Sequence, residues 1–187
     1  MQSSGAALSA APHFIAYIGL GGNLGDVHTR LRQARDGMSL FPSTAVLASS
    51  PLYRTKPVDA TGPDYINAVI ALRTPLGPLE LLSCLQALEI HHDRQRPYVN
   101  APRTLDLDVL WHGGLQREAD PLHLPHPRML QRAFVLEPLW DVVQTLRCQP
   151  SRLDGLFPVL MAENLPDAGR RAILAQEQGI ERLDQPF

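Results

Sequence analysis

Two aspartates spaced two residues apart, Asp106 and Asp108, are the side chains most suited to chemistry in this chain. They follow Arg103 and begin an apolar run through Trp111 that is typical of a buried strand. Because side chains alternate along a strand, the two carboxylates should share one face, about 6 to 7 Å apart. The opposite face would then carry Leu105, Leu107, Val109 and Trp111. Two ionised carboxylates this close repel each other unless a cation or a proton joins them.

The cation that best fits the pair is magnesium, which is usually held by one or two carboxylates and completed by water and substrate phosphates. The planar fork of Arg103 adds a phosphate ligand beside it. Asp106 and Asp108 are therefore predicted metal ligands in a magnesium and nucleoside triphosphate site. Taken alone, an Asp-x-Asp pair is more often the solvated face of an edge strand. An EF-hand loop is disfavoured, because Leu110 and Trp111 stand where an oxygen ligand and a glycine are needed.

The composition is that of one globular domain. The chain has 187 residues, 44% of them hydrophobic, and a formal net charge of −2, which gives no basic field for nucleic acid. Lys56 is the only lysine, so a bound anion must be held mostly by arginine. No run approaches the roughly 20 apolar residues of a membrane span, and residues 1–12 lack the pattern of a signal peptide. We expect a cytoplasmic monomer without nucleic-acid or membrane partners.

The order of the expected elements indicates the fold. Hydrophobic periodicity and turn residues predict strands at 14–20, 46–53, 65–72 and 104–111, with helices at 26–40 and 78–92. This βαββαβ order predicts an α+β, ferredoxin-like antiparallel sheet with helices. A further helix at 127–140 should be broken or kinked at Pro138. We divide the chain into a disordered tail (1–12), a catalytic domain (13–150) and a C-terminal extension (151–187) with a weak helix near 169–178.

A glycine-rich loop, Gly19 to Gly25, follows the first expected strand. It does not match a dinucleotide fingerprint, because Leu24 stands where a glycine is required, and no Gly-Lys-Ser/Thr follows to make it a P-loop. By itself the loop predicts only a tight turn that needs positive φ.

The ordered motifs resemble the 6-hydroxymethyl-7,8-dihydropterin pyrophosphokinase family over about residues 14 to 140. The most specific is Pro-Arg-Thr-Leu-Asp-Leu-Asp at 102–108, and the others are decisive only together. They are the segments 18–26, 53–57, 64–68 and 124–128, with Gln86, Glu89, Arg94, Arg96, Arg132, Phe134, Pro138 and Leu139.

The resemblance implies transfer of pyrophosphate from ATP, the co-substrate, to the hydroxymethyl group of the pterin, which yields AMP. Two magnesium ions would lie between Asp106, Asp108 and the triphosphate. By the same resemblance the catalytic residues are Arg94, Arg96, Arg103, Asp106 and Asp108. The ATP-binding residues are Gln86, Glu89, Arg94, Arg96, Arg103, Val109, His126 and Arg132.

The pterin is a flat heterocycle, which binds well between aromatic faces and presents an amide-like edge. The resemblance implies that Tyr65 and Phe134 stack on it while Asn67 reads the edge. The complete implied set is Thr55, Lys56, Val58, Tyr65, Asn67, Asp106 and Phe134.

Two departures from the family stand near these motifs. Gly22 replaces a common serine in the first loop, which should keep the turn, and Asn100-Ala101 replaces a Trp-Gly pair seen in many relatives. Two other functions stay open. A nucleotidyltransferase also pairs a glycine-rich loop with Asp-x-Asp, although about 80 residues separate Gly22 from Asp106 here. A non-enzymatic ferredoxin-like ligand-binding module would explain the fold but not the carboxylates.

Overall fold

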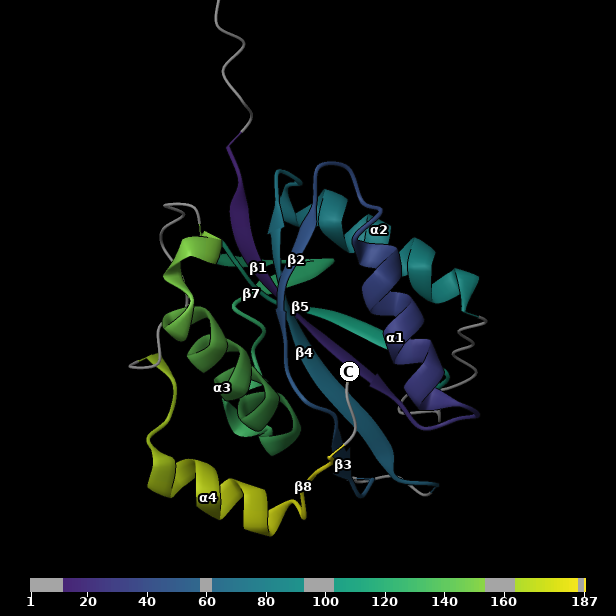
Figure 1. Cartoon of the computed structure of the whole chain (residues 1–187), viewed down its shortest axis with the longest axis vertical. Helices are drawn as coiled ribbons and strands as arrows, with labels where there is room; N and C mark the ends of the chain where they lie inside the picture. Colours follow the sequence, from purple (N-terminus) through teal and green to yellow (C-terminus); the bar gives the residue numbers. More distant parts are fainter. Residues whose placement is uncertain (1–11, 58–61, 93–102, 154–163, 185–186) are drawn as a thin grey trace, which may run out of the picture.

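The protein is described from a computed structural model that covers residues 12–57, 62–92, 103–153, 164–184 and 187. Its centre is a six-stranded sheet in the order β5-β1-β4-β3-β8, with β2 also paired to β4 (Figure 1). Every pairing in this sheet is antiparallel. The predicted mixed fold with an antiparallel sheet is therefore confirmed. The strands are β1 (Phe14–Gly22), β2 (Ala45–Ser49), β3 (Tyr53–Thr55), β4 (Tyr65–Thr74), β5 (Asp106–His112) and β8 (Glu181–Arg182).

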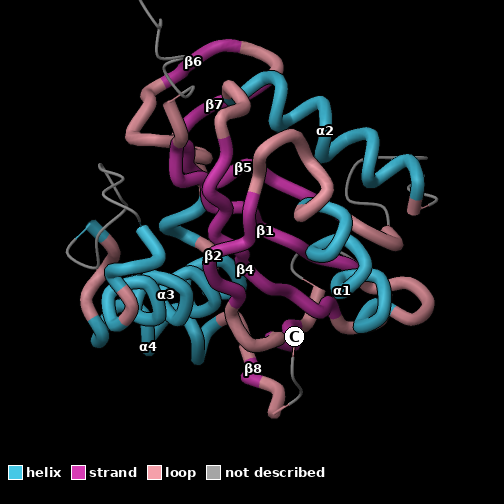
Figure 2. Tube along the Cα trace, turned by 45° about the horizontal axis from the view of Figure 1, so that its top comes forward, coloured by secondary structure: helices cyan, strands magenta, loops and turns pink. Residues whose placement is uncertain are grey.

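Helices cover both faces of the sheet (Figures 1 and 2). α1 (Val27–Met38) and α2 (Pro78–His91) bury one core against it, which includes Ile18, Leu31 and Leu85. α3 (Ala133–Cys148) buries a second core on the other face, which includes Tyr17, Leu136 and Leu139. The remaining elements are a hairpin of β6 (Arg117–Ala119) and β7 (Leu122–Leu124), two 3₁₀ turns (Met129–Gln131 and Pro150–Leu153) and α4 (Ala168–Glu177).

The first predicted helix is confirmed with its cap. The Asp26 side chain accepts the N–H of Thr29 at 3.1 Å, as an N-cap residue does. The second predicted helix is also confirmed within a residue of its expected end.

The prediction of one strand at 46–53 is wrong, because the segment forms β2 and β3 with a break between them. Pro51 has no N–H to give to a ladder. Ser50 bridges the break through its hydroxyl, which accepts the N–H of Val69 at 3.0 Å and donates to the carbonyl of Pro51 at 2.7 Å. The break changes the direction of the chain. β3 then pairs with the first residues of β4, so that Thr55 lies opposite Tyr65.

The expected position of Trp111 is also wrong. The ladder between β1 and β5 shifts register so that Ile18 pairs with Val109 and Tyr17 with Trp111, which leaves Leu110 as an extra residue. A bulge of this kind reverses the alternation beyond it. Trp111 therefore packs with Tyr17 in the core under α3, with ring centroids 5.6 Å apart, rather than beside Leu107.

The helix predicted at 127–140, with a break or kink at Pro138, has the wrong bounds at both ends and is not broken at the proline. The segment begins with a 3₁₀ turn, and α3 then runs from Ala133 to Cys148 with Pro138 inside it. Proline there removes one bond, to the carbonyl of Phe134, in the second turn of the helix. The apolar stripe of Leu136, Leu139 and Leu146, buried on the sheet, keeps the helix continuous past that loss.

The weak helix expected near the C-terminus is confirmed as α4, but β8 was not predicted. β8 pairs with β3, so residues from the C-terminal extension join the same sheet as the rest of the chain. The division between a catalytic domain and an extension at residue 150 stays a prediction. Residues 1–11 of the predicted disordered tail lie outside the described residues. No helix in the described part of the chain is long and apolar enough to cross a membrane.

Candidate active site

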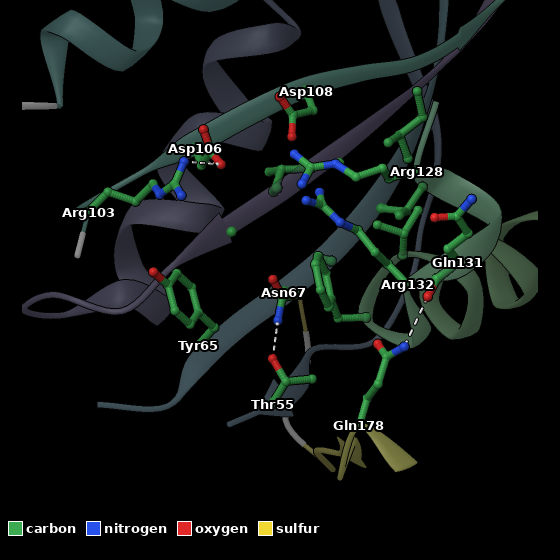
Figure 3. A pocket seen from close by; sticks show the side chains of 18 of the residues that line it. Thr55, Tyr65, Asn67, Arg103, Asp106, Asp108, Arg128, Gln131, Arg132 and Gln178 are labelled. Atoms are coloured by element: carbon green, nitrogen blue, oxygen red, sulfur yellow. Dashed lines mark hydrogen bonds and ion pairs between the residues drawn. The ribbon is translucent and has the colours of Figure 1, made fainter. Parts of the chain in front are cut away.

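A cavity of about 370 Å³ opens where β1, β4 and β5 pass the N-terminal end of α3 (Figure 3). The sheet face that forms it is the one α3 covers further along. Several elements contribute side chains that are far apart in sequence. The polar and aromatic lining consists of Thr55, Lys56, Tyr65, Asn67, Arg103, Asp106, Asp108, Arg128, Gln131, Arg132, Phe134 and Gln178.

Both carboxylates predicted as metal ligands line this cavity. Strand alternation places Asp106 and Asp108 on one face of β5, before the bulge, and Leu110 continues the same face as an apolar floor. Among the described residues, no group of three or more His, Cys, Asp or Glu side chains could hold a metal by itself. Two carboxylates open to a cavity fit magnesium, which takes its remaining ligands from water and phosphate.

The glycine loop fixes the segment that carries Arg103. Asn23, which is buried, donates its N–H to the carbonyl of Arg103 at 3.0 Å, and its side-chain oxygen accepts the N–H of Arg103 at 2.9 Å. Its amide group donates to the carbonyl of Pro63 at 3.2 Å. The loop therefore acts as a clamp between two chain segments.

Gly22 does more than keep a turn. A Cβ atom there would lie 2.6 Å from the carbonyl oxygen of Thr104, which is too close for any side chain. A serine at this position, which the family resemblance led us to expect, would fit only if the backbone at Thr104 moved. The departure at Gly22 is thus coupled to the close approach of the segment that leads into β5.

Arg103 is held against the first carboxylate. Its Nη1 lies 2.7 Å from Oδ2 of Asp106, and both side chains are about four-fifths buried. Burial acts to lower the pKa of Arg103, but the Asp106 carboxylate and the Tyr65 hydroxyl outweigh it, so the net shift is upward. The guanidinium group is therefore a permanent cation beside the carboxylates.

Two further guanidinium groups face Asp108 from the other side. Arg128 and Arg132 lie side by side and point toward this carboxylate in Figure 3. The pKa of Arg132 is lowered, first by burial and then by the charge of Arg128. Cations that repel each other in this way are suited to hold an anion such as a polyphosphate between them.

The other half of the cavity is lined by aromatic and amide groups. Asn67 is buried, and its amide group donates to the hydroxyl of Thr55 at 3.0 Å, so that its carbonyl side faces the cavity region of Gly21. Tyr65 and Phe134 also line the cavity. The guanidinium carbon of Arg132 lies 5.3 Å from the centroid of the Phe134 ring. This cation–π contact joins the two halves of the cavity.

Four of the predicted ATP ligands are not part of this lining. Gln86 is exposed on α2, and Val109 is buried in the core on the opposite face. His126 is half-buried, and its Nδ1 accepts the N–H of Arg128 at 3.2 Å. Glu89 is buried beneath β5. Val58, Arg94 and Arg96 lie outside the described residues, so the roles implied for all these side chains stay predictions.

Three lining residues were missed by the sequence analysis or given no role, as was Asn23, which holds the Arg103 backbone but does not line the cavity. Arg128 stood within a quoted motif, and its charge was the signal that could have marked it. Gln131 precedes Arg132 and could have been found by proximity. Asn23 and Gln178 act by hydrogen-bonding to the backbone of segments that are distant in the sequence, and no local sequence pattern indicates such contacts.

Glu89 gives a testable consequence for the strand that carries the carboxylates. Its Oε1 accepts the N–H of Leu107, between Asp106 and Asp108, at 2.6 Å. Glu89→Ala should lower the free energy of unfolding by roughly 1 to 3 kcal/mol, because it leaves the buried N–H of Leu107 without this acceptor. Glu89→Gln keeps an acceptor oxygen and should lose less. Urea unfolding of the two variants checks this, and equal losses would show that the bond to Leu107 contributes nothing.

The fold and the cavity together define a class of protein. Paired carboxylates and convergent guanidinium groups beside an aromatic slot suit a transferase that moves part of a polyphosphate onto a flat second substrate. The model of one such family, 7,8-dihydro-6-hydroxymethylpterin-pyrophosphokinase (HPPK), matches residues 17–144. The chain belongs to this family.

Individual relatives agree with the family match. The chain is 42% identical over 157 residues to the 2-amino-4-hydroxy-6-hydroxymethyldihydropteridine pyrophosphokinase of Pseudomonas aeruginosa, across 81% of this chain and 97% of that protein. It is 40% identical over 131 residues to the protein of the same name from Bacillus subtilis, across 70% and 78%.

Solved structures of low identity share the fold. Wild-type HPPK-DHPS of Plasmodium falciparum with STZ-DHP superposes with a TM-score of 0.52 at 15% identity, over 83% of this chain and 45% of that one. The same protein with SDX-DHP gives 0.54 at 12% identity, over 83% and 48%. The chain thus spans just under half the length of these two solved chains.

Proposed function

We propose that this protein transfers the pyrophosphoryl group of ATP to the hydroxymethyl group of 6-hydroxymethyl-7,8-dihydropterin in folate synthesis. The single observation that carries the proposal is one cavity in which Asp106, Asp108 and the arginines Arg103 and Arg132 lie beside Asn67 and the two aromatic rings. The family membership supports the same reaction. The strand order supports a ferredoxin-like arrangement of the catalytic domain, followed by the C-terminal extension.

The chemistry is an in-line displacement. The alcohol oxygen of the pterin forms a bond to the β-phosphorus, the bond from that phosphorus to the bridging oxygen of the α-phosphate breaks, and AMP leaves. The protein's part is to position the two substrates and to neutralise the charge that shifts onto AMP. Arg103 and Arg132 supply fixed cations for this purpose.

Asp106 and Asp108 would hold two magnesium ions in this reaction. When bound, the ions would supply further charge neutralisation for the triphosphate. The support for this is the chemistry of the donor set: two carboxylates two residues apart on β5, in a cavity whose other described charged lining residues are all cations. We further propose that Arg94 and Arg96 approach the triphosphate, that Gln86, Glu89, Val109 and His126 help to bind ATP, and that Thr55, Lys56 and Val58 complete the pterin site.

The pterin half follows from shape and hydrogen bonding. Tyr65 and Phe134 supply apolar ring faces, and the buried amide of Asn67 supplies polar atoms for the edge of the heterocycle. The substrates are small molecules, and we propose that the protein works as a cytoplasmic monomer without nucleic acid or membrane.

The products of ATP distinguish this function from its alternatives. Purified protein with magnesium, ATP and the pterin should release AMP in a 1:1 ratio with a diphosphorylated pterin, measured by ion-exchange chromatography. Release of pyrophosphate would indicate a nucleotidyltransferase. Absence of pterin-dependent ATP consumption would indicate a ligand-binding module and would overturn the proposal.

A further inference from the structure

We propose that Gln178, at the end of α4, is a positioning residue that holds the pterin half of the cavity in shape. The inference rests on the proposed function, because it concerns which substrate the variants bind less well. It assigns a role to the C-terminal extension, for which the sequence showed no motif. Gln178 lines the cavity together with Gln131, to which a dashed line joins it in Figure 3.

Gln178 closes the open end of α3. The first N–H groups of a helix have no partner within it, and the residue before α3, Arg132, provides no side-chain cap. Oε1 of Gln178 accepts the N–H of Ala133 at 2.8 Å, and Nε2 donates to the carbonyl of Gln131 at 2.9 Å. One amide therefore grips the backbone on both sides of Arg132 and immediately before Phe134.

α4 is anchored firmly enough for Gln178, which caps its C-terminal end, to have this effect. The guanidinium carbon of Arg171 lies 3.9 Å from the centroid of the Trp140 ring, and its Nη1 lies 3.2 Å from Glu137 on α3. The Arg171 side chain is 8% exposed, so the pair is largely shielded from solvent. Gly179, with φ of 60°, then ends the helix directly after Gln178.

The chain beyond Gly179 reaches the other wall of the pterin half. β8 pairs with β3 so that Arg182 lies opposite Tyr53, and the N–H of Leu183 donates to the carbonyl of Leu52 at 2.8 Å. β3 ends in Thr55, whose hydroxyl accepts from Asn67. The C-terminal segment therefore ties the α3 wall, with Phe134, to the β3 wall, with Thr55.

This arrangement separates positioning from chemistry. Both polar ends of the Gln178 side chain bond to the protein backbone, so the residue acts through Phe134 and Gln131 rather than on the reacting atoms. Asp106 and Asp108 lie on β5, whereas Arg132 lies between the two backbone groups that Gln178 holds. Loss of Gln178 should therefore weaken pterin binding through Phe134 and lower turnover through Arg132, and affect ATP binding less.

Three substitutions test the inference. Gln178→Ala and Gln178→Met both remove the two hydrogen bonds, but Met keeps the volume, and Gln178→Glu keeps the acceptor for Ala133 alone. We expect KM for the pterin to rise about tenfold in the Ala and Met variants and less in the Glu variant. KM for ATP should change by no more than about twofold. The matched control is Gln176→Ala, an exposed glutamine on the same helix, which should behave like the unaltered protein.

For each variant, direct pterin binding is measured by fluorescence titration and stability by thermal melting. A Met variant equal to the unaltered protein, or equal losses for both substrates, would overturn the positioning role. A loss confined to the melting temperature would overturn it as well. The proposed function has its own readout: if the unaltered protein fails to release AMP, that proposal falls, whereas altered binding in the variants is still measured by titration.

Discussion

Replacing Asp106 or Asp108 by alanine is expected to lower turnover at least about a thousandfold, equivalent to about 4 kcal/mol of transition-state stabilisation. Each carboxylate is proposed to hold part of the charge that neutralises the triphosphate, and the cavity offers no third acidic group among its described lining residues. The free energy of unfolding should change little, because removal of one carboxylate relieves repulsion between the two. Single-turnover measurements of AMP formation, beside urea unfolding, test both parts.

The control for this experiment is Asp36→Ala, which removes an exposed carboxylate that pairs with the neighbouring Arg35. It should leave turnover unchanged. An Asp108 variant that unfolds readily and yet keeps its specific activity would mean that the carboxylates are structural, and the magnesium proposal would fail.

Replacing Arg132 by alanine is the second change with a large expected effect, a loss of about a hundredfold or more in turnover. The guanidinium group lies between Asp108 and the ring of Phe134, where it can stabilise negative charge that develops on the phosphates. Arg132→Lys keeps the charge without the planar fork and should recover only part of the loss. Steady-state kinetics with both substrates varied are the measurement.

Two further variants test whether the effect of Arg132 is specific to the phosphate half of the cavity. Phe134→Ala should weaken pterin binding by roughly 1 to 3 kcal/mol through lost ring contact, with ATP affinity nearly unchanged. Arg147→Ala removes an exposed arginine from the far end of α3 and should change neither. Equal loss of both ligands in the Arg132 and Phe134 variants would contradict the division of the cavity into a phosphate half and a pterin half.

The features that could be predicted from sequence are those encoded by neighbouring residues. The two aspartates share a face because strand alternation is local, and Asp26 caps α1 because a cap needs only the next three residues. The co-location of Tyr65, Asn67, Arg132 and Phe134 followed from the family resemblance, since no periodicity brings these segments together.

The features that could not be predicted depend on contacts between distant segments. Whether Trp111 follows the alternation depends on how β5 pairs with β1, where its partner Tyr17 lies 94 residues earlier in the chain. Whether α3 needs a cap from elsewhere depends on Gln178, 45 residues beyond Ala133. The two-residue strand β8 has too few side chains to show a pattern and exists because β3 offers it an edge.

The extra residue in β5 favours substrate binding but lowers the stability of the sheet. Because of it, Leu110 and Trp111 both face α3, one as the floor of the cavity and the other as part of the core. A strand lacking Leu110 would keep Trp111 on the same face and restore a regular ladder, but the cavity would lose its apolar floor. Selection for a sturdier sheet would therefore favour a shorter strand, whereas selection for substrate binding would retain the irregular one.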